Sequence, residues 1–239
     1  MKQRLDKLMA ARGLARTRSE AESWIRLGRV KVNGKVVAKA GEFIAEDAEV
    51  VLDAPERYVS RAGLKLASVA RTLNIDFKDA TVLDVGSSTG GFTDYALQHD
   101  ARKVYAVDVG TEQLHPSLRG NERIELHEKT DIRNFKPSEP VDIVVIDVSF
   151  ISLREILPHI ATIVTPKTQV VAMVKPQFEA DRRQLGNSGV VKNDTIRRQI
   201  LKDFETWAKR YFVIVDKADS EVAGANGNRE RFYLLLGSR

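Results

Sequence analysis

The sequence of 239 residues contains no cysteine, which excludes disulfide bonds, thiolate nucleophiles and cysteine metal ligands. It has only four histidines, His99, His115, His127 and His159, and their scattered positions do not show the spacing of a metal site. No apolar run is long enough to cross a membrane, and the basic first residues lack the apolar core of a secretion signal. We therefore expect a cytoplasmic protein without a metal or a membrane segment.

The composition is that of a folded globular chain, with 43% hydrophobic and 30% charged residues. The net charge of +5 is unevenly distributed. Residues 1–40 hold 11 of the 38 Lys and Arg residues but only 3 of the 33 acidic residues. This surplus favours a nucleic-acid footprint at one end of the chain. A solvated helical face and a docking site for an acidic protein remain alternatives.

The amino-terminal part has the pattern of a small α+β module. One short helix is expected over residues 4–12, and a second after a cap at Thr17 or Ser19. Val30–Val37 alternates around an Asn-Gly pair, which predicts a hairpin with a two-residue turn. A last strand is expected over residues 49–52.

This part resembles the S4-like RNA-binding domain. The resemblance rests on the RLDKL start, the basic residues before the second helix and the G-x-V-x-V-N-G pattern from Gly28. It implies that basic side chains contact RNA phosphates, which provide affinity and positioning more than sequence choice. The matching positions are Arg4, Arg12, Arg16, Arg18, Arg26, Arg29 and Lys31. We expect this domain to span residues 1–54, followed by a linker over 55–59 that contains Pro55 and a second domain over 60–239.

The stretch from Thr81 to Asp108 predicts a ligand site. A buried apolar strand leads into the turn Gly86-Ser87-Ser88-Thr89-Gly90-Gly91, then a helix and a second strand that ends in Asp108. An acid about 20 residues past such a turn is placed to bind a ribose diol. The turn does not keep the GxGxxG spacing, and its compact, hydroxyl-rich form suits a ligand without phosphates, such as S-adenosylmethionine (SAM). Another nucleotide cofactor, or no ligand, remains an alternative.

The rest of the second domain alternates strands and helices, which predicts a doubly wound α/β sheet of the Rossmann-like kind. Strands are expected over residues 123–127, 141–147, 168–174, 212–215 and 232–236, and helices over 60–73, from 148 onwards and over 196–209. Asp147 and Lys175 each follow a buried strand. Because ligands bind beyond the carboxyl ends of such strands, we expect both side chains to face the cleft beside the glycine turn.

Six motifs in this domain are YVSRAGLKL, DVGSSTGGFTD, AVDVG, VDIVVIDVSFISL, VKPQFE and GNRERF. They resemble the FtsJ-type RNA ribose 2′-O-methyltransferases, and with the S4-like domain the whole chain resembles the TlyA (haemolysin A-like) family of rRNA methyltransferases. The resemblance implies a catalytic tetrad of Lys65, Asp147, Lys175 and Glu230. It also implies SAM as cofactor, bound by Gly86, Ser88, Gly90, Gly91, Phe92, Asp108, Asp131 and Asp147, with Asp131 beside the adenine.

The chemistry assigns a role to each member of this tetrad. A ribose 2′-hydroxyl is a weak acid, so in-line methyl transfer needs a base and exact placement. A lysine acts as a base only when its surroundings disfavour its charge. We expect Lys175 to be the base, tuned and oriented by Lys65 and Asp147. Glu230 is expected to hold a lysine or the ribose, and Glu179 is its rival.

Further expectations concern the substrate. Phe150 and Phe178 either stack on an RNA base or pack in the core, and the segment Gly186–Gly189 covers the substrate. The expected partner is ribosomal RNA in ribosomal subunits, with cytidine in 16S or 23S rRNA as the target that the resemblance implies. Two other functions remain open: an RNA-binding assembly factor that keeps SAM as a structural ligand, and a membrane-damaging haemolysin.

Overall fold

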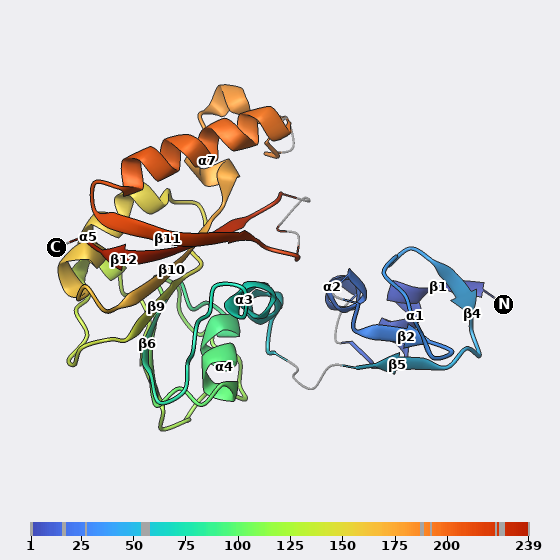
Figure 1. Cartoon of the computed structure of the whole chain (residues 1–239). Coiled ribbons are helices and arrows are strands. Elements are labelled where there is room, and N and C mark those ends of the chain that lie inside the picture. The colour runs from blue at the N-terminus through green and yellow to red at the C-terminus, as the bar shows by residue number, and fades with distance from the viewer. Residues whose placement is uncertain are drawn as a thin grey trace.

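The computed structural model describes residues 2–15, 18–26, 28–53, 58–186, 189–191, 193–222, 224 and 228–238, apart from the side chains of Ser19 and Ser23. The chain forms a small amino-terminal module and a large carboxy-terminal one, which lie side by side (Figure 1). Part of the predicted linker, residues 55–57, and the predicted cap Thr17 lie outside the described residues.

The small module contains two helices and two small sheets. Its elements are β1 (Lys2–Arg4), α1 (Leu5–Ala11), α2 (Arg18–Arg26), β2 (Val30–Val32), β3 (Lys35–Val36), β4 (Phe43–Ala45) and β5 (Val50–Leu52). β2 pairs with β3 and β5, and the hairpin turns at Asn33 and Gly34, both with positive φ, as the Asn-Gly pair predicted. The antiparallel pair β1–β4 was not predicted. Ser19 lies inside α2, so its prediction as the helix cap was wrong.

The large module is built on a seven-stranded sheet. Its strands are β6 (Thr81–Val85), β7 (Lys103–Val107), β8 (Ile124–His127), β9 (Ile143–Ile146), β10 (Gln169–Val174), β11 (Phe212–Asp219) and β12 (Arg231–Gly237). They are arranged in the order β11-β12-β10-β9-β6-β7-β8, and β12 runs antiparallel to both of its neighbours. The first four strands of the domain and β10 are parallel. The chain order therefore reverses between β6 and β9, which is where ligands bind in sheets of this kind.

Helices cover both faces of this sheet and confirm the doubly wound prediction. α3 (Arg61–Ala70) and α4 (Gly91–Gln98) pack on one face, and α5 (Leu157–Ile163) and α7 (Asp194–Ala208) on the other (Figure 1). The hydroxyl of Ser60 accepts a hydrogen bond from the backbone N–H of Ala62 and caps α3, as predicted. The short helices are α6 (Pro176–Glu179), η1 (Ile132–Asn134), η2 (Leu153–Glu155) and η3 (Arg182–Gln184).

The segment after β9 differs from the prediction. A helix was expected from residue 148, but regular helix begins only with η2 and α5. Phe150 has φ +65°, a left-handed conformation that a bulky side chain rarely adopts and that no helix can contain. The apolar spacing of VSFISL is helical, but the backbone forms a loop that carries Phe150 to the surface, where its side chain is 92% exposed.

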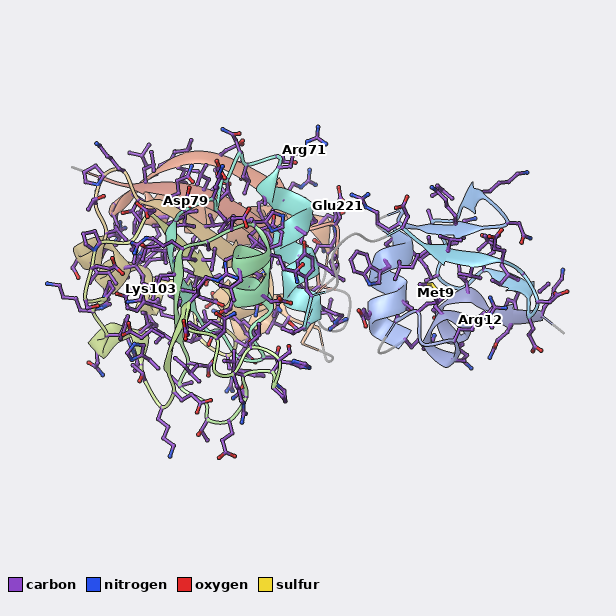
Figure 2. The ribbon with its side chains drawn as sticks, turned by 90° about the horizontal axis from the view of Figure 1, so that it is seen from below. Met9, Arg12, Arg71, Asp79, Lys103 and Glu221 are labelled. Atoms are coloured by element: carbon purple, nitrogen blue, oxygen red, sulfur yellow. The ribbon has the colours of Figure 1, made fainter. Side chains whose placement is uncertain are left out.

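The two modules approach each other beside α3. A pocket of about 480 Å³ is lined by Trp24 and Arg29 of the small module and by Leu64, Arg71 and Glu221 of the large one. Figure 2 shows Arg71 and Glu221 on the side of the large module that faces the small one. The catalytic residues predicted from the sequence all belong to the large module.

Candidate active site

Asp147 and Lys175 follow β9 and β10, which are parallel neighbours in the sheet. Their side chains form an ion pair in which Lys175 Nζ lies 2.6 Å from Asp147 Oδ1. Lys175 Nζ also donates a hydrogen bond of 2.7 Å to Ser149 Oγ, in the loop after β9. The Lys175 side chain is 8% exposed, so its charge has few water contacts and depends on these two partners.

Lys65 and Glu230 form a second ion pair next to the first. Lys65 lies on α3 and Glu230 immediately precedes β12. The distance from Lys65 Nζ to Glu230 Oε2 is 2.6 Å, and the Glu230 side chain is only 2% exposed. A buried charge is costly unless an opposite charge lies beside it, so each of these two side chains holds the other in place.

All four predicted catalytic residues line one cavity of about 520 Å³. The sequence predicted that the two lysines share a site. The structure adds that each ammonium has its own carboxylate, so the cavity contains two lysine–carboxylate pairs. Arg61 lies one helical turn from Lys65 and lines the same cavity.

A second cavity of about 490 Å³ adjoins the first and is lined by Gly86, Ser88, Asp108, Asp131 and Asp147. Asp108 accepts hydrogen bonds from the backbone N–H groups of Ser88, at 2.8 Å, and Gly110, at 2.6 Å. The Arg133 guanidinium binds Asp131, with a shortest distance of 2.6 Å, and lowers the pKa of its carboxyl. Gly86, Ser88 and Asp147 line both cavities, so the two form one continuous site at the β6–β9 switch point.

Asp84 is a site residue that the sequence reasoning missed. It lies within β6, is 1% exposed, and lines the first cavity. Its Oδ2 accepts a hydrogen bond of 2.6 Å from Thr93 Oγ1, but its buried Oδ1 has no hydrogen-bond partner among the described residues. Burial raises the pKa of Asp84 to about 7, and the nearby Asp147 carboxylate adds to this effect. An acid inside the otherwise apolar run VLDV was the signal that could have revealed it.

The glycines of the turn all lie close to other parts of the protein. Gly86 has φ +79°, and a Cβ there would lie 2.9 Å from the backbone oxygen of Asp147. Gly90 and Gly91, like Gly86, were predicted to bind the cofactor, and their Cβ positions are also filled by neighbouring residues. A Cβ at Gly90 would lie 2.5 Å from Leu118, and one at Gly91 would lie 2.3 Å from the Ser60 hydroxyl.

Phe92 and the rival acid Glu179 also have clear places. Phe92 is buried, lines the first cavity and lies 6.1 Å from the Phe232 ring between centroids. Glu179 accepts hydrogen bonds from Ser152 Oγ, at 2.6 Å, and from the backbone N–H of Leu153, at 2.7 Å. These contacts hold the loop between β9 and α5.

Among the described residues, no group of three His, Asp or Glu side chains is arranged to hold a metal ion. In the same residues, no helix has the length and apolar character that crossing a membrane requires.

Two family models match the chain. The FtsJ-like methyltransferase model matches residues 58–238, and the S4 domain model matches residues 3–50. The chain belongs to the FtsJ-like methyltransferase family.

Similar proteins cover three quarters or more of the chain. The 16S/23S rRNA (cytidine-2′-O)-methyltransferase TlyA of Mycobacterium tuberculosis is 35% identical, over 97% of this chain and 89% of its own length. The 23S rRNA (cytidine-2′-O)-methyltransferase TlyA of Campylobacter jejuni is 42% identical, over 76% of this chain and 72% of its own length. The solved structure of a “putative hemolysin” from Streptococcus thermophilus has a TM-score of 0.74 to this chain and 40% sequence identity. The match covers 99% of this chain and 89% of that one.

The predicted RNA-binding residues in the S4 domain of this FtsJ-like protein fall into two groups. The first group contacts other parts of the domain. Arg4 and Arg18 bind the buried carboxylate of Asp6, at 2.7 and 2.8 Å. Burial would raise the pKa of Asp6, but the hydrogen bonds from these two arginines outweigh it and hold that pKa below its ordinary value. Arg12 donates hydrogen bonds to the backbone oxygens of Ala48, at 2.7 Å, and Glu46. These three arginines therefore stabilise the S4 fold, whatever they contact on RNA.

The other group contains the remaining predicted residues. Arg26 and Arg29 are exposed. Lys31 forms an ion pair of 3.2 Å with Asp53 across the β2–β5 pairing. Arg16 was also predicted to bind RNA and lies outside the described residues. Arg26 and Arg29 are thus the predicted RNA contacts whose loss should disturb the S4 domain least.

Proposed function

We propose that this protein is a SAM-dependent rRNA methyltransferase that methylates a ribose 2′-hydroxyl of cytidine in 16S rRNA, 23S rRNA or both. The observation that carries the proposal is the convergence of Lys65, Asp147, Lys175 and Glu230 on one cavity, next to the pocket with Asp108 and Asp131. The two TlyA proteins described above act on this class of substrate by name. This function implies a cytoplasmic enzyme, because ribosomes lie there.

The residues of the site fit SAM. When bound, SAM supplies an electrophilic methyl group on a positively charged sulfur. The carboxylates of Asp84 and Asp147 provide a place for its positive charges, and Asp84 Oδ1 has no hydrogen-bond partner in the part of the chain that the structure describes. Asp108 at the end of β7 is suited to the ribose hydroxyls, and Asp131 lines the same pocket, which suits the adenine end. Gly86 lines both cavities, and its lack of a side chain lets its backbone lie close to that of Asp147.

The two ion pairs have different proposed roles at the RNA ribose. Lys175 is the proposed base. Once its own ammonium proton has passed to solvent, the neutral Nζ takes the proton of the 2′-hydroxyl as that oxygen accepts the methyl group. Asp147 and Ser149 hold this nitrogen in place from two directions, at 2.6 and 2.7 Å. Glu230 holds Lys65, whose ammonium places a positive charge beside the hydroxyl oxygen as that oxygen loses its proton.

The surface around the cavity suits RNA. Phe150 and Phe178 lie 5.4 Å apart between ring centroids and both line the cavity. Because Phe150 is 92% exposed, core packing does not account for it, and an exposed ring beside the proposed base suits stacking on an RNA base. Arg61 lines the same mouth and the S4 domain adds Arg26 and Arg29, which suit the phosphate backbone.

The proposal is tested by incubating the purified protein with tritiated SAM and purified ribosomal subunits. We expect label in rRNA, at a cytidine whose 3′ linkage resists alkaline hydrolysis because its 2′-oxygen is methylated. The Lys175→Ala variant is the control for contaminating enzymes. Unlabelled rRNA would refute the enzyme and favour an assembly factor, and label on a base would refute the ribose as target. Leakage of liposomes caused by the purified protein would favour the haemolysin.

A further inference from the structure

The backbone and the side chain of Glu230 both contact neighbouring segments. The backbone oxygen of Glu230 accepts a hydrogen bond of 3.0 Å from the N–H of Ser220, just after β11. On the inner side, a Cβ at Gly224 would lie 2.3 Å from Glu230 Oε1, so the carboxylate packs closely on that glycine. Glu230 precedes β12 directly, and its direction therefore depends on how the start of that strand is held.

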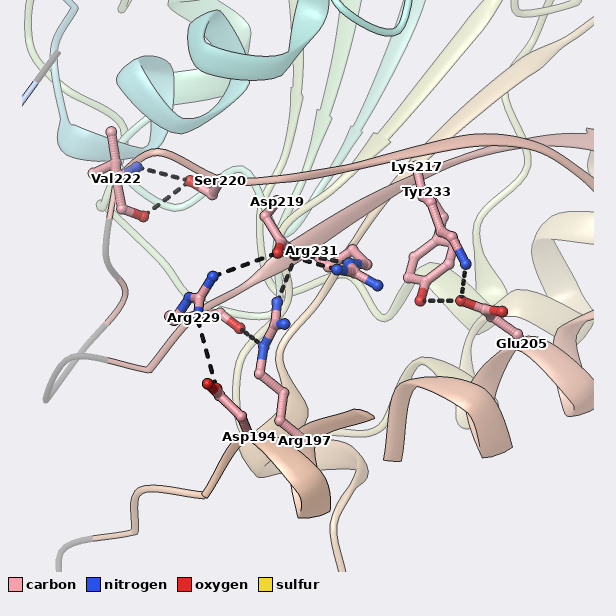
Figure 3. A network of polar contacts seen from close by, with 10 residues as sticks. All are labelled: Asp194, Arg197, Glu205, Lys217, Asp219, Ser220, Val222, Arg229, Arg231 and Tyr233. Carbon is pink, nitrogen blue, oxygen red and sulfur yellow. Dashed lines mark hydrogen bonds and ion pairs between the residues drawn. The ribbon is translucent and has the colours of Figure 1, made fainter. Parts of the chain in front are cut away.

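Arg197 holds the residue before Glu230. It lies on the first half of α7 and its side chain is 9% exposed, which is unusual for an arginine. Its Nε donates a hydrogen bond of 3.0 Å to the backbone oxygen of Arg229, and its Nη2 lies 2.6 Å from Asp219 Oδ1 (Figure 3). One buried guanidinium thus connects α7 to the backbone next to the catalytic carboxylate.

Asp219 holds the residue after Glu230. Its Oδ1 and Oδ2 accept hydrogen bonds from Arg231, at 2.6 and 3.0 Å, while Oδ1 also accepts from Arg197 (Figure 3). Burial would raise the pKa of Asp219, but these two arginines lower it to about 2, so the carboxyl is ionised throughout the neutral range. Arg197 and Asp219 together therefore fix both chain neighbours of Glu230.

We propose that Arg197 is a positioning residue, which acts through Arg229 and Asp219 to aim Glu230 at Lys65. This inference rests on the proposed function, in which the Lys65–Glu230 pair serves methyl transfer. Arg197 lines neither the cavity with Lys175 nor the pocket with Asp108, so its proposed effect on the reaction passes through the backbone that it holds beside Glu230. A small displacement is enough, because a shift of about 1 Å in a reacting group costs up to about 100-fold in rate.

A purely structural role for Arg197 predicts different behaviour, and α7 provides a matched control. Glu205 lies further along the same helix and also connects α7 to β11 and β12. It forms an ion pair of 2.7 Å with Lys217 and accepts a hydrogen bond of 2.9 Å from the Tyr233 hydroxyl (Figure 3). This second link has no contact with Glu230, so Glu205→Gln weakens the attachment of α7 without moving the site.

The experiment compares Arg197→Lys with Glu205→Gln in the full-length protein. A lysine keeps the charge for Asp219 but lacks the fork that also reaches the Arg229 oxygen. For Arg197→Lys we expect kcat to fall about tenfold, with KM for RNA and the Kd for SAM within about twofold of wild type. For Glu205→Gln we expect wild-type kcat even where Tm falls equally. Asp219→Asn, which keeps the shape of the acid, is a second variant measured in the same way.

A double-mutant cycle tests whether Arg197 affects kcat through Glu230. Glu230→Gln alone lowers kcat, and adding Arg197→Lys to it should cause no further loss if Arg197 acts through Glu230. Losses that multiply, wild-type kcat in Arg197→Lys, or an equal fall of kcat in Glu205→Gln would each overturn the inference. An inactive wild-type protein would refute the proposed function instead. In that case the crystal structure of Arg197→Lys still tests the inference, since an unchanged Lys65–Glu230 pair would contradict it.

Discussion

Lys65 Nζ lies 2.6 Å from Glu230 Oε2, although the two residues come from the first helix and the last strand boundary of the methyltransferase domain. The sheet brings them together, because β12 inserts between β10 and β11 and so returns the end of the chain to the side of β10. The pair is buried, which means that neither charge is stable without the other. Site assembly therefore depends on completion of the fold by its last strand.

Replacing Lys175 with alanine should strongly lower the rate of methyl transfer. Loss of a general base lowers rates by about 100-fold to 10,000-fold, so we expect a fall in this range. Labelling of rRNA with tritiated SAM measures the rate, and calorimetry measures SAM binding. Lys167 is a matched control, because it precedes β10, the strand that Lys175 follows, and is exposed. Lys167→Ala should retain wild-type activity, and retained activity in Lys175→Ala would remove Lys175 from the role of base.

Asp84 should make the folded protein lose stability as the pH rises. Its pKa is about 7 in the folded state and about 4 in an unfolded chain. Between these values the folded state holds a proton that the unfolded state has released. This contribution to stability is complete below about pH 4, falls as the pH rises, and is gone above about pH 7.

Asp84→Asn isolates this effect from the other carboxylates, since an amide cannot ionise but can still accept the hydrogen bond from Thr93. We expect the stability of the variant relative to wild type to increase from pH 4 to pH 7 and then to level off. Urea unfolding at a series of pH values measures it. Parallel curves for the two proteins would show that Asp84 does not titrate in this range. Because SAM is cationic and favours ionised Asp84, its Kd in the wild type should also fall over the same range.

The carboxyl ends of the strands could be predicted from the sequence. Apolar runs identify buried parallel strands, and such strands all point the same way, so Asp108, Asp147 and Lys175 had to meet at one edge. The pairing of the charges could not be predicted, because it depends on side-chain directions set by packing between distant segments. Asp84 was missed for a related reason: a single acid within a strand shows whether it faces core or cavity only when the layers of the fold are known.

Two local errors have physical causes of the same kind. The segment around Phe150 has helical apolar spacing, yet contacts of Glu179 with Ser152 and Leu153 favour a loop instead. In the turn, glycine could be predicted to bring the backbone close to something, but not to what. The Cβ position of Gly86 meets the backbone of Asp147, while those of Gly90 and Gly91 meet leucine side chains and the start of α3. A glycine in the sequence indicates that a side chain would not fit there, but it does not show which neighbouring residue occupies the space.

Gly86→Ala should weaken both the fold and SAM binding. The alanine would adopt φ near +79°, which costs about 1–2 kcal/mol for a residue with a Cβ, and that Cβ would lie 2.9 Å from the Asp147 oxygen. Gly120 is a matched control, because its φ is +75° and nothing lies within 4 Å of its Cβ position. Gly120→Ala should show the backbone cost alone, with unchanged SAM affinity. Thermal unfolding and calorimetry measure the two effects, and equal SAM affinity in both variants would place the cofactor away from Gly86.

The double variant Arg26→Ala, Arg29→Ala should weaken RNA binding without unfolding the S4 domain, because both side chains are exposed. Each phosphate contact that is lost lowers the salt dependence of the binding constant, by a slope of about 0.7 to 0.9 per contact. Titrating an rRNA fragment at several salt concentrations measures this slope, and we expect it to fall by about 1 to 2. Arg12→Ala provides the contrast: its guanidinium binds the backbone oxygens of Ala48 and Glu46, so its loss should lower Tm. A wild-type salt slope in the double variant would mean that RNA follows another face of the protein. A smaller salt slope in a variant whose Tm is also lowered would reflect loss of the fold. The Tm of the double variant is therefore measured together with its salt slope.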